Sequence, residues 1–332
     1  MMTMLSKENN SLEQIANVIK GNKSFSLYIH VHTDIDAIGS SLALKRAIEK
    51  MGKIANVFVD STFPNNAYMF EDTKLINNQS QREYDVAIVL DSNDENRIGR
   101  FKYKYRKNVK TTMLLDHHLD SPRFAKYNYV DTNVSSTCEV VYRIIKELGV
   151  EFDKEMCRLL ISGIYTDTGC LKFSNSYPST FKIVAELLDK SGLAMDEITV
   201  PLLSSLTVEA FNLRKLAHNR IEFFEDNQIA VMTLVAKDFK EIGVAFDETK
   251  GITDIAMQIG SVKIVALVSE GDQEPGVHYI SFRTKGDYNA KRIAETFGGG
   301  GHLKASGCKI AEPLEVAKKY VLDALKEELH RC

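Results

Sequence analysis

Short apolar runs alternate with amphipathic segments in the first third of the chain. Four runs have the length and composition of buried strands: 25–31, 54–60, 84–91 and 111–116. The segment 37–52, between the first two runs, has helical spacing. Such strand–helix alternation predicts an α/β fold, with a mostly parallel sheet flanked by helices. Three later segments also show helical spacing and should complete this N-terminal domain: 137–149, 154–167 and 178–191.

The last third of the chain predicts a second, smaller α/β domain. It contains three strand-like runs, a glycine run and a final helix, at 229–236, 261–270, 277–284, 298–301 and 313–330. A chain of 332 residues exceeds what one hydrophobic core usually supports. We therefore expect a catalytic domain over 1–192, a helical linker over 193–220 and a second domain over 221–332, with the two domains facing each other across a cleft.

The composition excludes several classes of protein. With 44% hydrophobic and 26% charged residues, the sequence is typical of a soluble globular protein. A net charge of −3 gives no sign of the large basic surface that long duplex nucleic acid requires. No apolar run is long enough to cross a membrane. The five cysteines form no CxxC pair, which argues against a disulfide framework or a thiolate zinc site and favours the cytoplasm.

Acidic and histidine side chains follow three of the predicted strands. His30, Asp34 and Asp36 follow the first strand, Asp91 follows the third, and Asp116-His117-His118 ends the fourth. Taken singly, Asp36 could instead cap the next helix, and Asp91 could be a turn residue. Three strand ends that share this property are harder to dismiss, because the carboxyl ends of parallel strands face the crevice where open α/β sheets bind their ligands.

A fourth acidic residue, Asp167, stands near the end of a predicted helix, where the helix dipole disfavours a carboxylate unless a cation compensates. Carboxylate and imidazole ligands without thiolate suit Mn²⁺ or Mg²⁺, and imidazole favours Mn²⁺. The acids outnumber what one ion needs. We therefore expect two divalent cations, about 3.5–4 Å apart, with Asp91 as the bridging carboxylate.

These motifs resemble those of the DHH phosphoesterase superfamily, in particular its members with a DHH-associated C-terminal domain. The resemblance rests on five motifs in order: HVHTDIDAIGSSLAL at 30–44, AIVLDSND, LLDHH, YTDTG and FGGGGHLKASG at 297–307. One departure concerns the first motif, where family members often have Pro-Asp-Gly-Asp and this chain has Thr33-Asp34-Ile35-Asp36. Both carboxylates are retained, so the departure bears on the turn and leaves the ligand types unchanged.

The resemblance implies a role for each residue of these motifs. One metal would be held by His30, Asp34 and Asp91, and the other by Asp36, Asp91, His117 and Asp167. Asp91, Asp116 and His118 would be catalytic, with Asp116 orienting the histidines and His118 reaching the scissile phosphate. The substrate would be clamped by the second domain, through Arg283, Gly298, Gly299, Gly300, Gly301 and His302.

The two-domain arrangement with this glycine signature resembles the bifunctional nanoRNases, which trim very short RNAs and dephosphorylate pAp (3'-phosphoadenosine 5'-phosphate). Short single-stranded oligonucleotides, pApA, pAp and cyclic di-AMP are all candidate substrates, and the direction of cleavage is open. A pyrophosphatase would have a different second domain, and an aspartic protease would need a second Asp-Thr-Gly. A nucleotide-binding regulator without catalysis would have lost a metal ligand. The oligomeric state is open, with a homodimer as one option.

Overall fold

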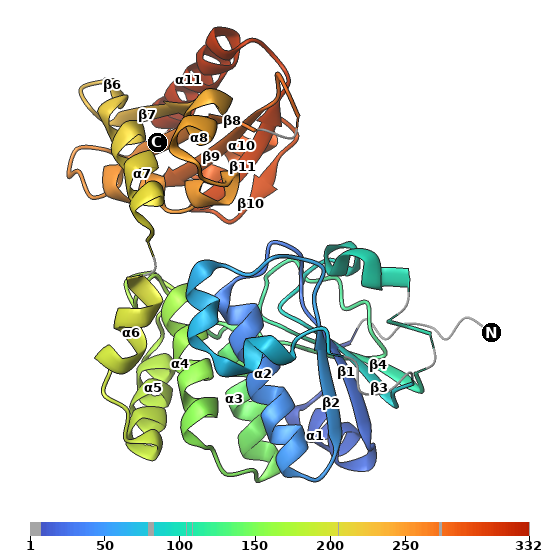
Figure 1. The fold of residues 1–332 in the computed structure, drawn as a ribbon. Helices are drawn as coiled ribbons and strands as arrows, with labels where there is room; N and C mark the ends of the chain where they lie inside the picture. Colours follow the sequence, from blue (N-terminus) through green and yellow to red (C-terminus); the bar gives the residue numbers. More distant parts are fainter. Residues whose placement is uncertain are drawn as a thin grey trace. The chain divides into compact units, whose positions relative to one another are not determined.

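The computed structural model describes residues 8–78, 83–103, 105–107, 109–204, 206–271 and 274–331. The chain divides into two compact units, Met1–Ser205 and Leu206–Cys332 (Figure 1). This division falls within the segment 193–220 that the sequence predicts as a linker. Each unit contains its own sheet and its own hydrophobic core.

The first unit is built on a five-stranded, fully parallel sheet in the order β2-β1-β3-β4-β5. Its strands are β1 (Ser24–Tyr28), β2 (Ile54–Phe58), β3 (Val86–Leu90), β4 (Thr111–Asp116) and β5 (Tyr127–Val130). The register pairs Tyr28 with Val89 and Leu90 with Leu115, so β1, β3 and β4 end at the same edge. The predicted parallel α/β fold is confirmed, and β5 is a strand that the sequence pattern missed.

Helices cover one face of this sheet, and shorter segments cover the other. Three helices contact the sheet: α1 (Leu12–Gly21), α2 (Ile35–Lys50) and α3 (Thr137–Leu148). Helix α4 (Lys154–Asp167) packs on α2 and α3, and α5 (Pro178–Ser191) and α6 (Asp196–Leu203) pack on α4. Side chains alternate along β1: Leu27 packs with the helices, and Tyr28 packs with the 3₁₀ segment η3 (Glu95–Tyr103) on the other face. Every residue of β3 is buried, as expected for a strand covered on both faces.

Helices α2 and α4 pack closely because each has a glycine at the contact. A Cβ atom on Gly39 would lie 2.6 Å from the carbonyl oxygen of Leu159, and one on Gly163 would lie 2.3 Å from Cys138 Sγ and 2.9 Å from Asp36 Oδ1. Backbone atoms can approach this closely only where no side chain intervenes. The two glycines therefore bring the start of α2, the start of α3 and the end of α4 together.

The second unit contains a six-stranded mixed sheet in the order β10-β11-β9-β8-β7-β6, in which only β7 and β8 are parallel. Its strands are β6 (Glu222–Phe224), β7 (Ile229–Leu234), β8 (Ile264–Glu270), β9 (His278–Thr284), β10 (Gly300–Gly301) and β11 (Ala305–Ile310). One face packs on α10 (Ala290–Glu295) and α11 (Leu314–Arg331). The other packs on α7 (Val208–Asn219), α8 (Ala236–Ile242) and α9 (Ile252–Ala256).

Most predicted elements are confirmed within two or three residues. The helices predicted at 137–149, 154–167 and 178–191 correspond to α3, α4 and α5, and Gly192 ends α5 in the left-handed conformation. The prediction was incomplete at the glycine run, because Gly300 and Gly301 form the short strand β10 of a hairpin with β11. Among the described residues, no helix is long and apolar enough to span a membrane.

Candidate metal centre

The acidic and histidine residues of the first unit lie at the edge where β1, β3 and β4 end. His30 follows β1, Asp91 follows β3, and Asp116 is the last residue of β4. Adjacent strands of one sheet lie about 5 Å apart, so residues that follow neighbouring strands are close. Asp167 reaches the same place from the end of α4, and Asp36 from the first turn of α2.

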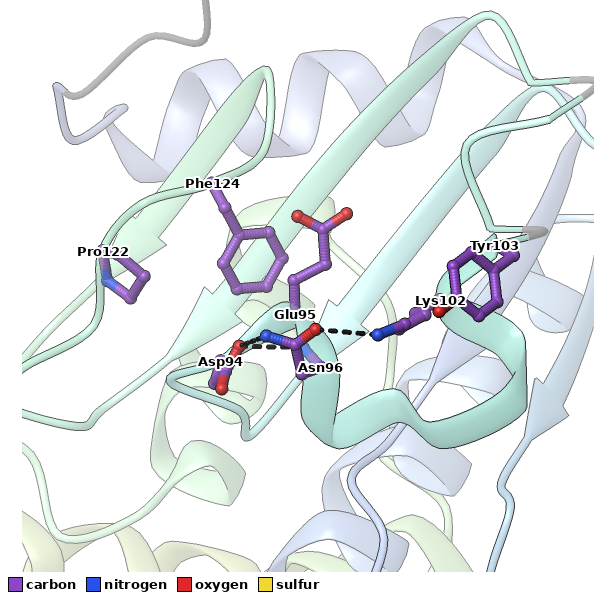
Figure 2. A pocket seen from close by; sticks show the side chains of 7 residues that line it. All are labelled: Asp94, Glu95, Asn96, Lys102, Tyr103, Pro122 and Phe124. Carbon is purple, nitrogen blue, oxygen red and sulfur yellow. Dashed lines mark hydrogen bonds between the residues drawn. The ribbon is translucent and has the colours of Figure 1, made fainter.

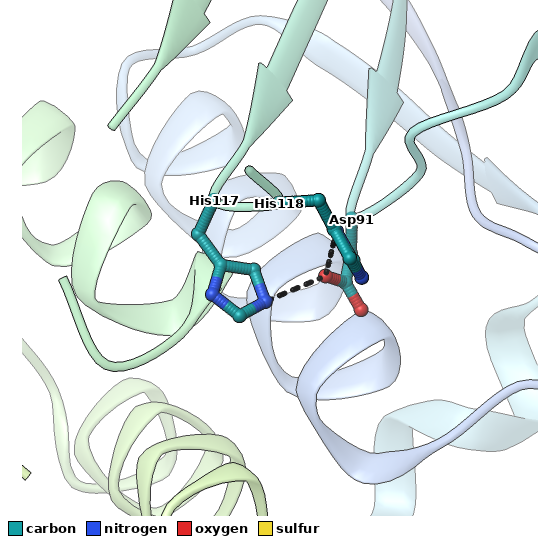
Figure 3. Close-up of side chains that lie close together, drawn as sticks. All are labelled: Asp91, His117 and His118. Carbon is teal, nitrogen blue, oxygen red and sulfur yellow. Dashed lines mark ion pairs between the residues drawn. The ribbon is translucent and has the colours of Figure 1, made fainter. Parts of the chain in front are cut away.

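Nitrogen and oxygen atoms of these residues converge. Within the described chain, three groups have ligand atoms that all lie within 4.8 Å of one another: His30 with Asp34 and Asp91, Asp36 with His117 and Asp167, and Asp91 with His117 and His118. Asp91 belongs to two groups, and so does His117. Figure 3 shows the Asp91 carboxylate directed toward both histidines, with His117 Nε2 at 3.6 Å and His118 Nδ1 at 3.9 Å from Oδ1.

The remaining distances connect these groups around Asp91. His30 Nε2 lies 3.4 Å from Asp91 Oδ2 and 3.7 Å from Asp34 Oδ2. On the other side, His117 Nε2 lies 3.6 Å from Asp167 Oδ2. These separations are too long for strong hydrogen bonds and are of the size expected between two ligands of one cation. The donor set, oxygen with imidazole nitrogen and no sulfur, fits such a cation.

Asp36 is held by the start of α3. Its Oδ2 accepts a hydrogen bond of 2.8 Å from the backbone N–H of Thr137, and its Oδ1 accepts one of 2.9 Å from that of Cys138. These N–H groups belong to the first turn, where no helical carbonyl is available to them and the dipole favours an anion. The cap of α2 is Asp34, which accepts from Ala37 N, so the alternative role of Asp36 as the cap is wrong.

Thr137 also contacts Asp91 through its side chain, since Thr137 Oγ1 donates a hydrogen bond of 2.9 Å to Asp91 Oδ1. Thr137 is fully buried and lies 46 residues from Asp91 in the sequence. The sequence predicts a helix over 137–149, and α3 does begin at Thr137, with Ser136 as its cap. The contact with Asp91 was not predicted, because no local pattern reveals it.

Asp116 is buried at the end of β4 and organises the two histidines that follow it. Its Oδ1 accepts hydrogen bonds from the backbone N–H of His117 at 2.9 Å and from His118 Nδ1 at 2.7 Å. The side chain of Asp116 is fully buried. A buried carboxylate at this position fixes the orientation of the His118 ring.

His30 is oriented by two neighbours outside the cluster. Its Nδ1 lies 2.7 Å from the carbonyl oxygen of Val31, so a proton on Nδ1 leaves Nε2 facing Asp34 and Asp91. Arg97 Nη2 lies 3.3 Å from the same Nδ1, and the Arg97 carbonyl accepts from Val31 N. Arg97 is therefore a positive charge beside the cluster that the sequence analysis did not identify, although its place six residues after Asp91 could have suggested it.

The backbone at Asp91 is itself unusual. Its φ is +56°, in the left-handed region that aspartate tolerates better than most residues do. Its N–H donates to the carbonyl oxygen of Leu115 on β4, which fixes the turn. Residues held in this region cluster at functional sites.

The carboxylates of this cluster repel one another when no cation is present. Burial, with the nearby charges of Asp91 and Asp34, raises the pKa of Asp36 to about 8. Burial and the charges of Asp36 and Asp91 likewise raise the pKa of Asp167 well above its usual range. Protons then supply the positive charge that the site lacks. A divalent cation supplies the same charge, so the arrangement of these residues fits metal binding.

The histidines differ in their protonation. Burial lowers the pKa of His30, but the interaction with the nearby carboxylates of Asp34 and Asp91 outweighs burial and raises it to about 10. Burial also opposes charge on His118, yet the hydrogen bond with Asp116 raises its pKa to about 9. For His117, burial outweighs the charge of Asp91 and lowers the pKa. Burial acts to raise the pKa of Asp91, but these three histidines hold it below its ordinary value.

The predicted clamp residues lie in the second unit. Arg283 on β9 pairs with Ala305 on β11, which directly follows the turn of the β10–β11 hairpin that begins at His302. The Arg283 side chain is one-third exposed and lies 3.9 Å from Asp254 Oδ1. Burial lowers the pKa of this guanidinium. The hairpin therefore brings Arg283 near the glycine run.

The four glycines of this hairpin are not equivalent. A Cβ on Gly299 would lie 2.2 Å from the Gly307 carbonyl oxygen, and one on Gly301, whose φ is +139°, would lie 2.7 Å from that of Ala305. Gly298 has a φ of +70°. Gly300 is exposed, and a Cβ there would meet nothing within 4 Å. Packing or backbone conformation thus explains why glycine stands at 298, 299 and 301, but neither requires glycine at 300.

Comparison with known proteins agrees with this arrangement. Residues 25–164 match the DHH family, N-terminal domain, and residues 226–331 match the DHHA1 domain. A bifunctional oligoribonuclease and PAP phosphatase, NrnA, from Thermus thermophilus is 30% identical over 96% of this chain and 94% of its own. A probable manganese-dependent inorganic pyrophosphatase from Streptococcus agalactiae is 24% identical over 70% of this chain and 81% of its own.

The fold has a close counterpart among solved structures. An exopolyphosphatase-related protein from Bacteroides fragilis superposes with a TM-score of 0.88 at 26% identity, over 95% of both chains. One of the two domain matches lies in each unit, and the similarity to the Thermus protein extends over nearly the whole chain. The chain therefore belongs to the DHH family, a family of phosphoester hydrolases, and carries a DHHA1 domain after its DHH domain.

Proposed function

We propose that this chain hydrolyses very short RNAs and linear dinucleotides such as pApA to mononucleotides, and also dephosphorylates pAp to AMP. The observation that carries the proposal is the convergence of three histidines and four carboxylates at one edge of the parallel sheet. The name of the Thermus relative, an oligoribonuclease and PAP phosphatase that matches over almost the full length of both chains, supports this choice of substrates.

The cluster, together with the manganese-dependent relative, supports the use of divalent metal. We assign one Mn²⁺ to His30, Asp34 and Asp91, and a second to Asp36, Asp91, His117 and Asp167, with Mg²⁺ as the alternative metal. When bound, such a pair supplies Lewis-acid charge to the phosphate and lowers the pKa of water. Asp91, which belongs to two of the ligand groups, is the proposed bridge.

The protein's own residues then position the substrate. Asp116 holds the His118 ring at Nδ1, and this bond keeps His118 protonated and able to donate a charge-assisted hydrogen bond to the scissile phosphate. In the second unit, Arg283 and His302 would add positive charge, and Gly300 would let a backbone N–H approach a phosphate oxygen. The assignment of these residues to the clamp rests on the family resemblance.

The test is a substrate panel with purified protein and either Mn²⁺ or Mg²⁺. The panel contains pAp, pApA, a 24-mer RNA, cyclic di-AMP and pyrophosphate, and it follows released mononucleotide or phosphate. We expect turnover of pAp and pApA and little of the 24-mer or of pyrophosphate. Preferential cleavage of cyclic di-AMP would favour a cyclic dinucleotide phosphodiesterase instead. If none of these compounds is turned over with either metal, the result would favour a nucleotide-binding regulator without catalysis.

Substitutions at two positions probe the two units separately. Asp91→Asn should abolish turnover because the proposed bridging carboxylate is lost. The melting temperature should stay near that of the parent, since asparagine also tolerates the left-handed backbone and keeps an oxygen for the Thr137 hydroxyl. Retained Mn²⁺-dependent activity would contradict the assignment. Arg283→Ala should chiefly raise the KM, and Arg283→Lys, which keeps the charge, should recover part of it. An unchanged KM would remove Arg283 from the clamp.

A cytoplasmic location and a homodimer remain predictions from the sequence. Light scattering on the purified chain, with and without Mn²⁺, measures the mass in solution and tests the homodimer directly.

A further inference from the structure

The segment that follows Asp91 is strongly basic. Residues 97–110 contain seven arginines and lysines and no acid, although the whole chain has a net charge of −3. Three aromatic residues alternate with the basic ones: Phe101, Tyr103 and Tyr105. Basic and aromatic side chains in alternation suit single-stranded nucleic acid, because cations meet phosphates and rings stack on bases.

A pocket of about 400 Å³ lies between this segment and the loop that follows β4 (Figure 2). In Figure 2, Lys102 and Tyr103 from η3 stand on one side and Pro122 and Phe124 on the other. Its lining is completed by Asp94 from the loop after β3 and by Glu95 and Asn96 at the start of η3. The volume is in the range of small-molecule sites.

The pocket is built on the same two loops that carry the proposed metal ligands. Asp94 is three residues after Asp91, and Pro122 is four residues after His118. An extended chain spans at most about 3.6 Å per residue, so the lining begins within about 11–14 Å of the cluster. Asn93 Nδ2 donates to Asp120 Oδ1 at 2.9 Å and joins the two loops. A nucleotide adjacent to the one being cleaved lies at this range.

The side chains that line the pocket suit a nucleotide. Tyr103 is 68% exposed, and Lys102 Nζ lies 4.8 Å from the centre of its ring and 3.1 Å from Asn96 Oδ1. Lys102 therefore presents a cation beside an exposed aromatic face. Asn96 adds an amide to the lining, and Phe124 contributes a largely buried ring.

The acidic residues of the lining are already engaged. Glu95 accepts hydrogen bonds from Tyr105 Oη at 2.6 Å and from Arg106 Nε at 2.8 Å, which neutralises its charge. Asp94 Oδ1 accepts from the backbone and side chain of Asn96. The charge of Glu95 is thus compensated, the Asp94 carboxylate is hydrogen-bonded within its own turn, and Lys102 supplies a cation to the lining.

We propose that this pocket binds the second nucleoside of an oligonucleotide, with Tyr103 stacking on its base and Lys102 donating a hydrogen bond to its base or sugar. This nucleoside is attached to the scissile phosphate at the position where pAp carries no nucleoside. The proposal rests on the proposed function and deepens it. A substrate with nucleosides on both sides of the scissile bond engages the pocket, whereas pAp, with one nucleoside, reacts without it. One cluster of metal ligands then serves both substrates.

The experiment compares Tyr103→Ala, Tyr103→Phe and Lys102→Gln with the parent protein on pApA and pAp. Tyr68→Ala is the matched control, because Tyr68 is 67% exposed and follows β2, which β1 separates from β3 and β4. Binding of a methylenephosphonate analogue of pApA, which is not hydrolysed, is measured in parallel. Melting temperatures report on folding.

We expect Tyr103→Ala to lower kcat/KM for pApA and to weaken binding of the analogue by about 5- to 100-fold, the range of base stacking on aromatic rings. Tyr103→Phe should retain most of both, Lys102→Gln should weaken both, and pAp turnover and the Tyr68→Ala control should be unchanged. Unchanged analogue binding in Tyr103→Ala, or equal losses on pAp and pApA, would overturn the proposal. The parent protein could also bind the analogue, with weaker binding in Tyr103→Ala, and yet turn over neither substrate. This result would refute the proposed function but not the proposed nucleoside pocket.

Discussion

Replacing Thr137 with valine removes a single hydrogen bond from the proposed bridging carboxylate. Thr137 Oγ1 donates to Asp91 Oδ1 at 2.9 Å, and both side chains are buried. A hydrogen bond to a charged group contributes about 1.5–3 kcal/mol, and the loss of an outer partner of a metal ligand weakens metal affinity about 10- to 100-fold. Valine keeps the backbone N–H that Asp36 accepts, so only the Asp91 contact is lost.

The assay is calorimetric titration of Mn²⁺ into chelator-treated protein, together with the Mn²⁺ concentration that gives half-maximal turnover of pApA. We expect Thr137→Val to raise the dissociation constant for Mn²⁺ and the half-maximal Mn²⁺ concentration, each by about 10- to 100-fold. The melting temperature should stay close to that of the parent. Thr137→Ser retains the hydroxyl and the N–H, and it is the matched control. We expect its Mn²⁺ affinity to stay near that of the parent.

Mn²⁺ binding by Thr137→Val as tight as that of the parent would refute the role of Thr137, because Asp91 would then need no support from α3. An equal loss of affinity in Thr137→Ser and Thr137→Val would refute it too, since the effect would then come from packing. A large fall in melting temperature in the valine variant alone would show that the hydroxyl stabilises the fold.

Two further predictions concern charge and packing. The pKa of Asp36 rises from 3.8 to about 8 on folding, so its contribution to stability is present below pH 3.8 and lost as the pH rises through about 8. In EDTA, the melting temperature of the parent should therefore fall more steeply between pH 3.8 and about 8 than that of Asp36→Asn, and Mn²⁺ should reverse the fall. Equal pH dependence of the two melting temperatures would show that Asp36 is not the cause. In the second unit, Gly300→Ala should melt like the parent but show a raised KM, whereas Gly299→Ala should melt at a lower temperature, because its Cβ would lie 2.2 Å from the Gly307 carbonyl oxygen. An unchanged KM for Gly300→Ala would show that no ligand approaches this glycine.

The parallel α/β architecture and the candidate ligands followed from the amino-acid sequence. Strand-length apolar runs that end in acids or histidines place those groups at one edge of a parallel sheet, because all strands of such a sheet end on the same side. This reasoning identified His30, Asp91 and Asp116 from position alone. The family resemblance then supplied their proposed roles.

How these groups are held depends on contacts between elements that are distant in the sequence. Asp36 and Thr137 are 101 residues apart, and no local pattern indicates that the first turn of α3 binds the Asp36 carboxylate. The assignment of the α2 cap to Asp34 also depended on the backbone conformation. Gly300 was distinguished from Gly299 only by what a Cβ atom would touch on β11. Local sequence reports which elements form, whereas contacts between distant elements depend on how those elements pack.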